Sequence, residues 1–264
     1  MMSAGKYRRM SNFVGKDGKS TIVAFDHGAT SGPMKGIEDP GEILKKIVAG
    51  KPDAVLCTVG VAEKYKEILA DTGLIVRIDF PATDLVPGPS DCMLLIEVKE
   101  AVQLGADAII MTAGPGVGVE RTTMANFTQV ARECNEYGMP FIAEMYPGGF
   151  NPAPEMINID NLKLAARMAA EWGADFLKMP YRPGYEPVVE GTFIPIVVLG
   201  GAKTNSEEEF LASIREAVDA GAVGCAIGRN AWGASNPTNM VRALNAIIHD
   251  GASTKEAISI LKGE

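Results

Sequence analysis

The segment AAEWGADFLKMPY, residues 169–181, contains a connection that repeats along the chain. Its first half reads as the end of a helix, and its second half, from Phe176, is apolar enough to be a strand. Gly173 lies between the two halves, where a glycine can adopt the left-handed conformation that ends a helix. The segment therefore predicts a helix that passes into a strand within two or three residues.

The same connection occurs in AVQLGADAII (101–110) and AVDAGAVGCA (217–226), and more loosely in IVAGKPDAVL (47–56). Short apolar strands alternate with helical patterns over the whole chain. The strands we expect cover residues 21–27, 54–58, 74–79, 108–113, 140–146, 176–181, 195–201 and 224–230. Eight strands with intervening helices in 264 residues predict an α/β fold of the (β/α)8 TIM-barrel type. We expect one barrel domain over residues 1–264, with residues 1–20 as an N-terminal extension before the first strand.

The connections differ between the two ends of the strands. Helix-to-strand connections are short, whereas the segments after the third, fifth and sixth strands (81–91, 147–158 and 182–187) are long and rich in Pro and Gly. Long loops on one face are where a barrel builds its active site. A doubly wound open sheet is the alternative, but it should have a glycine-rich turn after the first strand. Here that strand ends in Asp26-His27-Gly28.

Composition excludes several classes of function. The net charge is -8 and no run of basic residues occurs, so neither nucleic acid nor a membrane is an expected partner. The N-terminal residues lack the apolar core of a signal peptide, and no apolar run approaches the ~20 residues of a membrane helix. Of the four scattered cysteines, three lie in or near apolar runs and indicate packed thiols in a reducing cytoplasm. Two histidines are too few for a zinc site built from several imidazoles. We expect no metal and no cofactor.

Ionisable residues lie at the ends of separate predicted strands. Asp26 ends the first strand, Tyr146 ends the fifth, and Lys178 lies within the sixth. Strand side chains alternate between faces, so Glu144 shares a face with Tyr146, and Phe176 shares one with Lys178. If these faces point to the barrel axis, an amine, a phenol and two carboxylates converge near its mouth.

Such a group suits imine chemistry. A neutral lysine amine can attack a ketone, and the protonated imine then accepts the electrons of a breaking C–C bond. A tyrosine can take the proton of the leaving hydroxyl, and a carboxylate can help to dehydrate the carbinolamine. Each residue also has a structural interpretation. Lys178 could be half of an ion pair, Tyr146 a packed ring, and Asp26 a helix cap.

A phosphate site is predicted after the last two strands. Gly200 and Gly201 follow the seventh strand, and Gly228 and Arg229 follow the eighth. Glycines let backbone N–H groups approach an anion, and in barrels these two loops are the usual phosphate site. Arg229 could add a bidentate contact, and Lys203 either neutralises phosphate or is solvated. The alternative is that the glycines only turn the chain.

Further candidates are weaker. His27 alternates away from the axis, yet at a strand end it could reach a substrate. Asp79 and Asp84 flank the long loop after the third strand and either contact substrate hydroxyls or stabilise turns. Trp172 fits a helix packed on the barrel wall, which is a core position.

At this point the chain resembles a known family over essentially its whole length, the archaeal-type class I aldolases together with the dehydrin-type aldolases. AFDHGATSGPMKG (24–36) is similar to the family's D-H-G motif, and EMYPGG (144–149) to its Y-P-R-G motif. GADFLKMPY (173–181) resembles its Schiff-base lysine strand. GGAKTNSEEEF (200–210) and GAVGCAIGRN (221–230) resemble its paired phosphate-binding segments.

The resemblance implies a (β/α)8 barrel that forms an imine at Lys178, with Tyr146 as acid/base and Asp26 assisting. It implies a phosphorylated sugar substrate held by the glycines of the seventh and eighth strands and by Arg229. It also implies a homo-oligomer, often ten-membered, and no metal.

Two positions depart from the family pattern. The arginine of Y-P-R-G is Gly148 here, and an apolar residue expected two positions before the tyrosine is Glu144. A carboxylate about 6.6 Å deeper than the tyrosine would repel a second phosphate and favour a hydroxyl, an ammonium or the imine itself. Alternatively, Glu144 only pairs with a buried base. Both departures weaken assignment to fructose 1,6-bisphosphate, and neither removes the imine machinery.

The sequence thus predicts a Schiff-base aldolase that cleaves or forms a phosphorylated ketose, releasing dihydroxyacetone phosphate or an analogue and an aldehyde. A transaldolase-type synthase or thiolase with the same lysine, of the aminodideoxyheptulosonate or autoinducer type, is the first alternative. A non-catalytic phosphosugar-binding protein is the second, although a binding protein would not need Lys178, Tyr146 and Asp26 together.

Overall fold

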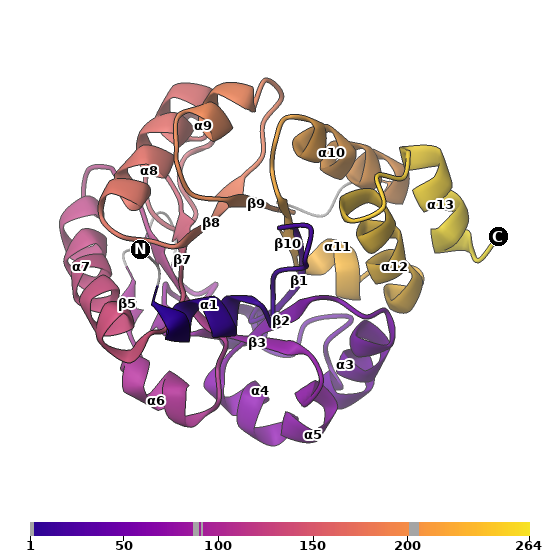
Figure 1. The fold of residues 1–264 in the computed structure, drawn as a ribbon, viewed down its shortest axis with the longest axis horizontal. Helices are drawn as coiled ribbons and strands as arrows, with labels where there is room; N and C mark the ends of the chain where they lie inside the picture. Colours follow the sequence, from indigo (N-terminus) through magenta and orange to yellow (C-terminus); the bar gives the residue numbers. More distant parts are fainter. Residues whose placement is uncertain (1–2, 87–89, 91, 201–205) are drawn as a thin grey trace.

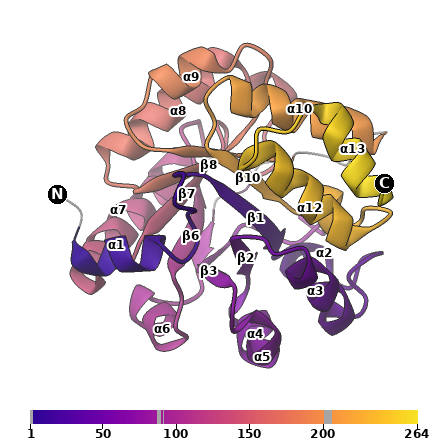
Figure 2. The same ribbon diagram turned by 45° about the vertical axis from the view of Figure 1, so that its right-hand side comes forward.

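Eight parallel strands close into a barrel, and helices surround it (Figures 1 and 2). The structure, a computed structural model, describes residues 3–86, 90, 92–200 and 206–264. Around the barrel the strands follow the order β1-β10-β9-β8-β7-β6-β3-β2. Their bounds are Ser20–Phe25 (β1), Ala54–Cys57 (β2), Gly73–Arg77 (β3), Ala108–Ala113 (β6), Phe141–Met145 (β7), Phe176–Pro180 (β8), Ile196–Leu199 (β9) and Gly224–Ile227 (β10). The predicted TIM barrel is confirmed, and the open sheet was the wrong alternative.

Helices follow most of the strands and pack on the outside of the barrel (Figure 1). Those preceding β6 are α1 (Ala4–Met10), α2 (Gly28–Ser31), α3 (Pro40–Ala49), α4 (Val59–Lys64), α5 (Lys66–Leu69) and α6 (Val98–Gln103). Those following it are α7 (Glu120–Tyr137), the 3-10 turn Pro154–Met156, α8 (Ile159–Glu171), α9 (Glu186–Glu190), α10 (Glu207–Asp219), α11 (Arg229–Trp232), α12 (Pro237–Ile248) and α13 (Thr254–Lys262).

The short helix-to-strand connections have the expected backbone at three of the four places. Gly105, Gly173 and Gly221 all have positive φ, between 77° and 100°. In the looser fourth connection Gly50 has φ -78°, and the left-handed residue is Lys51. The position requires a glycine for another reason: a Cβ at residue 50 would lie 2.5 Å from the Cβ of Val241 on α12. This glycine therefore allows close helix packing and does not end the helix by its φ.

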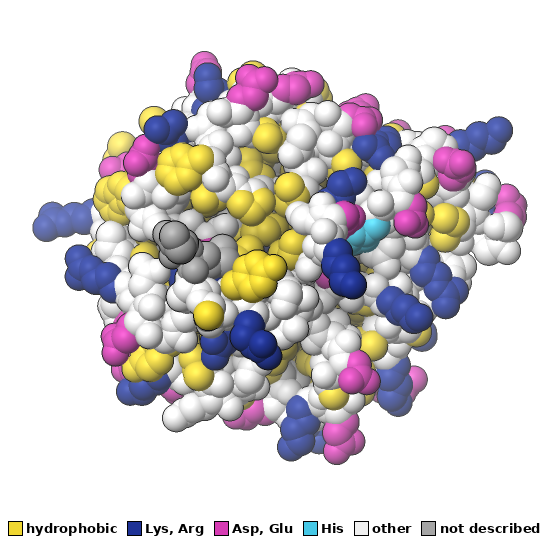
Figure 3. Space-filling view, viewed as in Figure 1, with side chains coloured by type: hydrophobic (Ala, Val, Ile, Leu, Met, Phe, Trp, Pro, Cys, Tyr) yellow, Lys and Arg dark blue, Asp and Glu magenta, His cyan; other side chains and the backbone are white. Residues whose placement is uncertain are grey.

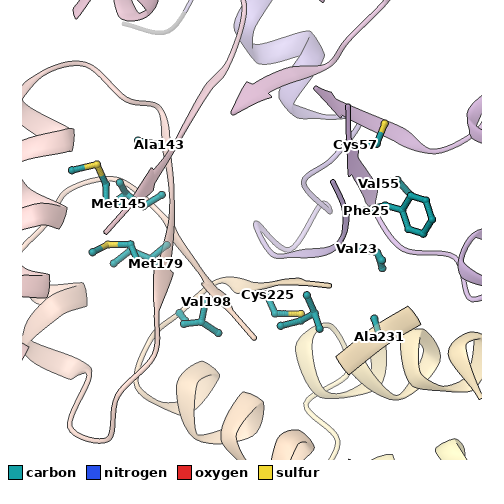
Figure 4. Close-up of a cluster of buried hydrophobic side chains, with 14 of the residues drawn as sticks. Val23, Phe25, Val55, Cys57, Ala143, Met145, Met179, Val198, Cys225 and Ala231 are labelled. Carbon is teal, nitrogen blue, oxygen red and sulfur yellow. The ribbon is translucent and has the colours of Figure 1, made fainter. Parts of the chain in front are cut away.

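Strand alternation divides the core into two layers. One layer fills the barrel and contains Ile22, Ile75, Ile110, Ile142 and Phe176, closed at the amino-terminal end by Phe13. The other lies between the strands and the helices, and Figure 4 shows part of it, with side chains from β1, β2, β7, β8, β9, β10 and α11. Because positions two residues apart share a face, the residues that follow the inner layer along each strand also point to the axis.

The third strand is shorter than predicted. We expected it to run to Asp79, but β3 ends at Arg77, and Asp79–Phe80 (β4) pairs antiparallel with Met93–Leu94 (β5). Ile78 keeps its hydrogen bond to Ile110 O at 3.1 Å, so the chain leaves the barrel only after this residue. The hairpin forms the base of the long loop predicted after this strand.

Segment α1 lies across the amino-terminal end of the barrel, in the foreground of Figure 1. Lys6, only 5% exposed, donates to Asp175 at 2.7 Å and to Asn135 at 2.8 Å. On the face seen in Figure 3, acidic and basic side chains are interspersed around the rim, and hydrophobic side chains gather toward the centre. Within the described parts of the chain, no helix is both long and apolar enough to cross a membrane.

Two expectations about single residue types have different outcomes. All four cysteines are buried, one more than the three expected as packed thiols. The core position expected for Trp172 is wrong: this residue follows the last turn of α8 and is 45% exposed. The helical periodicity places Ala165, Ala166 and Ala169 against the barrel, and Trp172 lies where the helix ends and the chain turns away.

His249 joins two acidic side chains at the amino-terminal face. Its Nδ1 lies 2.9 Å from Asp17 Oδ2, and its Nε2 lies 2.9 Å from Asp53 Oδ2. Asp53 Oδ2 also accepts a hydrogen bond of 2.7 Å from the backbone N–H of Thr21, the second residue of β1. Hydrogen bonds to Asp53 and Asp17 raise the pKa of His249 from 6.5 to about 9. The charged imidazolium therefore stabilises the folded chain.

We expect His249→Gln to lower the free energy of unfolding by about 1–2 kcal/mol at pH 7, a figure reduced for solvent screening. The folded pKa lies above the unfolded one, so this contribution is complete below pH 6.5 and disappears as the pH rises through about 9. Urea unfolding of the wild-type protein and the variant at several pH values measures the difference between their free energies of unfolding. A difference of constant size from neutral to alkaline pH would contradict the stabilising role of the charged His249.

Candidate active site

A pocket of about 220 Å³ opens at the carboxyl ends of the strands. Its walls come from β1, β3, β7, β8, β9 and β10 and from the segments that follow β1, β3, β7, β9 and β10. Asp26, Tyr146 and Lys178, predicted from three separate strands, all line it. Glu144 and Arg77 lie on its floor with them. The predicted convergence of an amine, a phenol and two carboxylates is therefore what the fold produces.

Lys178 is buried, with 5% of its surface exposed, and follows Phe176 on the inner face of β8. Its Nζ lies 2.6 Å from Oε1 of Glu144, which is 4% exposed and belongs to the neighbouring strand β7. The register of the two strands aligns Glu144 with Lys178 directly. The pair thus arises from alternation on each strand together with the register between them.

Arg77 is the residue that sequence reasoning missed. It ends β3 and is 8% exposed, and its guanidinium donates to carboxylates on three sides. Nε donates to Asp26 Oδ2, Nη2 to Glu144 Oε2, and Nη1 to Asp79 Oδ1 at 2.9 Å. An arginine inside the apolar run LIVRID, two residues after inward-pointing Ile75, was the signal that could have revealed it.

Thr112 on β6 completes this network. Its hydroxyl accepts from Arg77 Nη1 at 3.0 Å and donates to Glu144 Oε2 at 3.1 Å. Its backbone N–H donates to Asp79 Oδ2 at 2.8 Å. Asp79 is therefore a buried partner of Arg77 and of β6. Asp84, the other flanking candidate, lines the pocket.

The network keeps both functional carboxylates ionised. Burial raises the pKa of Glu144, but Lys178 and Arg77 more than offset this effect and lower it to about 2. Burial likewise raises the pKa of Asp26, and Arg77, His27 and Lys178 together hold it well below its usual value. Glu144 thus combines the two roles considered from the sequence. One oxygen faces the lysine amine, and the other pairs with a buried base.

Tyr146 directly follows β7 and is partly exposed to the pocket. Its ring packs edge-on against Phe150, with ring centroids 6.2 Å apart. Burial and the negative charge of Glu144 raise the pKa of the phenol above its ordinary value of 10. The resting side chain is therefore a neutral phenol that can donate a proton.

The pocket is also lined by Gly200, Gly228, Arg229 and His27. A Cβ at Gly228 would lie 2.3 Å from Cε1 of His27, so only glycine leaves room for this ring. His27 Nδ1 is also 3.4 Å from Asp26 Oδ1, and thus the ring lines the pocket in spite of strand alternation. Two further phosphate candidates, Gly201 and Lys203, lie outside the described residues.

The departure at Gly148 has a backbone explanation. Gly148 has φ 90°, a conformation that disfavours other residues, and a Cβ there would lie 2.9 Å from Cβ of Pro152. An arginine in this loop would need a different backbone path.

No metal cluster is formed by the part of the chain that the structure describes: no group of three or more His, Cys, Asp and Glu side chains is arranged to hold an ion. The carboxylates of the pocket instead surround Arg77 and Lys178.

Comparison with known proteins gives consistent results. Residues 20–234 match the family described as DeoC/LacD family aldolase. An uncharacterized aldolase of Saccharolobus solfataricus is 36% identical, with 98% of this chain and 99% of that protein covered. The 2-amino-3,7-dideoxy-D-threo-hept-6-ulosonate synthase 1 of Archaeoglobus fulgidus is 36% identical, with coverage of 96% and 95%.

A solved structure agrees in fold and in sequence. The Schiff base-forming fructose-1,6-bisphosphate aldolase superposes with a TM-score of 0.84 and 30% identity, covering 92% of this chain and 100% of that one. The similarity extends over nearly the whole chain.

Proposed function

The chain belongs to the DeoC/LacD family of aldolases, class I enzymes that work through a Schiff base without a metal, and we propose that Lys178 forms this Schiff base with a phosphorylated ketose. The observation that carries the proposal is the position of Lys178 Nζ. It is buried at the floor of a pocket, 2.6 Å from the ionised carboxylate of Glu144 and in reach of a substrate that enters past Tyr146. A lysine in this environment is a candidate nucleophile.

In imine formation an ammonium and a ketone become an iminium and water. The ammonium loses one proton before the amine attacks the carbonyl carbon, and a second proton passes from nitrogen to oxygen to give the carbinolamine. The carbinolamine hydroxyl then takes up one further proton and leaves as water. The nitrogen is therefore positive before and after the step. Glu144 Oε1 faces it throughout as its counterion, and Asp26 assists the dehydration from the side of β1.

Tyr146 acts on the C–C bond. In the condensation direction the neutral phenol protonates the aldehyde oxygen while the enamine carbon attacks the aldehyde carbon. In cleavage the same oxygen takes the proton of the hydroxyl while the bond breaks and its electrons move into the iminium. The raised pKa of the phenol agrees with its entering the condensation as the acid.

The phosphate of the substrate is proposed to lie at Gly200, Gly228 and Arg229, with Gly201 and Lys203 as further candidates. Support comes from their position after β9 and β10, the usual phosphate site of barrels. Arg229 is partly exposed and lines the pocket, so its guanidinium lies where it could contact the anion.

We expect Arg229→Gln to raise KM for dihydroxyacetone phosphate about tenfold to a hundredfold, because a charge-assisted contact contributes roughly 1.5–3 kcal/mol. The unphosphorylated analogue dihydroxyacetone should react with an unchanged KM. Steady-state kinetics with both ketones measure this difference. Arg242→Gln, an exposed position on α12, is the matched control. Equal effects on both ketones would place the phosphate elsewhere.

A second candidate is a synthase of the aminodideoxyheptulosonate type with the same lysine. The 36% identity to the Archaeoglobus synthase favours it, and it equals the identity to the Saccharolobus aldolase. The two activities differ in the group that meets the enamine. A panel of aldehyde acceptors, phosphorylated and unphosphorylated, offered to the ketose-loaded enzyme and followed by mass spectrometry of the products would separate them.

Homo-oligomerisation, possible as a decamer, and a cytoplasmic location stay predictions. The loop after β3 carries exposed apolar side chains, among them Leu85, Val86, Met93 and Leu95, which supports burial against another copy.

A further inference from the structure

We propose that Arg77 is a positioning residue for the reaction at Lys178: its guanidinium orients the two carboxylates, Asp26 and Glu144, that share the pocket with the reacting nitrogen. This inference rests on the proposed function, since it assigns a role within the imine chemistry. Arg77 belongs to no motif by which the sequence was interpreted. It is placed in the site only by the closure of the barrel, which brings β3 beside β6 and three strands from β8.

The guanidinium occupies one oxygen of each carboxylate. Asp26 uses Oδ2 for Arg77, which leaves Oδ1 on the side of His27. Glu144 uses Oε2 for Arg77 and Thr112, which leaves Oε1 for Lys178 Nζ. The planar fork therefore decides which lone pairs face the reacting end of the pocket.

Arg77 is itself held in place by hydrogen bonds to Asp79 and Thr112. Nη1 donates to Asp79 Oδ1 and to Thr112 Oγ1, and Asp79 Oδ2 accepts the backbone N–H of Thr112. The guanidinium is thereby tied to the wall strand β6 as well as to its own strand. Its plane is fixed by contacts that involve no substrate, as expected for a group that preorganises a site.

A purely structural ion cluster is the alternative. Buried arginine–carboxylate groups occur without function, and breaking one destabilises a protein. Two observations favour positioning. The cluster opens on the pocket, because Arg77, Asp26 and Glu144 all line it. The cluster also includes Lys178, which contacts Glu144. Any shift of the guanidinium therefore moves Glu144 and changes the surroundings of the reacting nitrogen.

The test is Arg77→Lys, which keeps the positive charge and removes the planar fork. We expect kcat to fall about a hundredfold, the cost of a misplaced catalytic group, with KM for the phosphorylated ketose little changed. Arg167→Lys, the same change at an exposed residue of α8, is the matched control and should behave as wild type.

The pH profile gives a readout that a structural role would not move. One ammonium cannot donate to Asp26, Asp79 and Glu144 together, so the pKa of at least one carboxylate rises in the variant. His27, Lys178 and Tyr146 also face these carboxylates and are unchanged by the substitution. The acid limb of kcat/KM should therefore move to higher pH in Arg77→Lys and stay in place in Arg167→Lys.

Thr112→Val is the milder second variant. It removes the hydroxyl between Arg77 and Glu144 at nearly constant shape, leaves the Asp79 contact, and should lower kcat about fivefold to tenfold. If circular dichroism shows that Arg77→Lys does not fold, the kcat and pH profile of Thr112→Val decide the test. Wild-type kcat and pH profile in a folded Arg77→Lys, or in Thr112→Val when only that variant folds, overturns the proposal. Failure of the proposed function looks different, because then wild type itself gives no borohydride-trapped adduct at Lys178.

Discussion

Lys178→Met is expected to lose its activity on phosphorylated ketoses by on the order of 10⁴-fold or more, because it removes the group that bonds to the substrate. Methionine keeps the unbranched apolar stem and fits the space between β7 and β9. Glu144 then loses its lysine partner and keeps Arg77 and Thr112, so its charge remains paired. The variant should therefore fold.

The measurement is borohydride trapping. Wild type incubated with dihydroxyacetone phosphate and borohydride should carry a stable adduct on the peptide that contains Lys178, because borohydride reduces the iminium to an amine. Lys178→Met should carry none and should still bind the ketone phosphate, as measured by calorimetry. Lys163→Met, at an exposed position of α8, is the matched control and should label as wild type.

Adducts scattered over surface lysines would make Lys178 structural. Retained turnover in the methionine variant would have the same meaning. In both cases the family's chemistry would have to use a different amine in this chain.

Tyr146→Phe is expected to lower kcat by about 10²- to 10⁴-fold, the usual contribution of an acid–base group. The iminium forms before the C–C bond changes, so the trapped adduct at Lys178 should be retained in full. Phenylalanine keeps the edge-on contact with Phe150, which makes a packing defect small. Turnover and trapping measured on one protein preparation test both statements.

Tyr185→Phe is the matched control. Tyr185 is fully buried beside α9, and it contacts Tyr181 outside the pocket, so loss of its hydroxyl should leave turnover unchanged. If trapping falls together with turnover in Tyr146→Phe, the phenol acts already in carbinolamine dehydration, and the assignment to the C–C step is wrong.

The barrel and most of the residues of the candidate site could be predicted from the sequence because both depend on local patterns. Glycine after a helix and apolar alternation in a strand act within a few residues, so the segment around Gly173 already predicts that a helix ends and a strand follows. The same alternation places Lys178 on the face of Phe176 and Tyr146 on that of Glu144. Once eight such units were counted, closure into a barrel put their carboxyl ends together.

Local patterns failed where a residue's role depends on a distant partner. Gly50 was interpreted as a helix-ending glycine, but its size is required by Val241 on α12. Trp172 was assigned to the core from its helix, but the helix ends there and leaves the ring 45% exposed. Asp79 was expected in the third strand, but it belongs to a hairpin. Its pairing partner lies beyond the following loop, so the pairing depends on residues outside the strand.

The sequence by itself determined the fold class, the strand faces and the residues proposed for imine chemistry, because propensity and alternation are properties of contiguous residues. Only the tertiary structure decided the electrostatics of the site. Arg77 meets Asp26 and Glu144 across 51 and 67 positions of chain, and Glu144 meets Lys178 through the register of β7 on β8. The charge state of a buried group depends on its nearest opposite charges, and the closure of the barrel decides which charges those are.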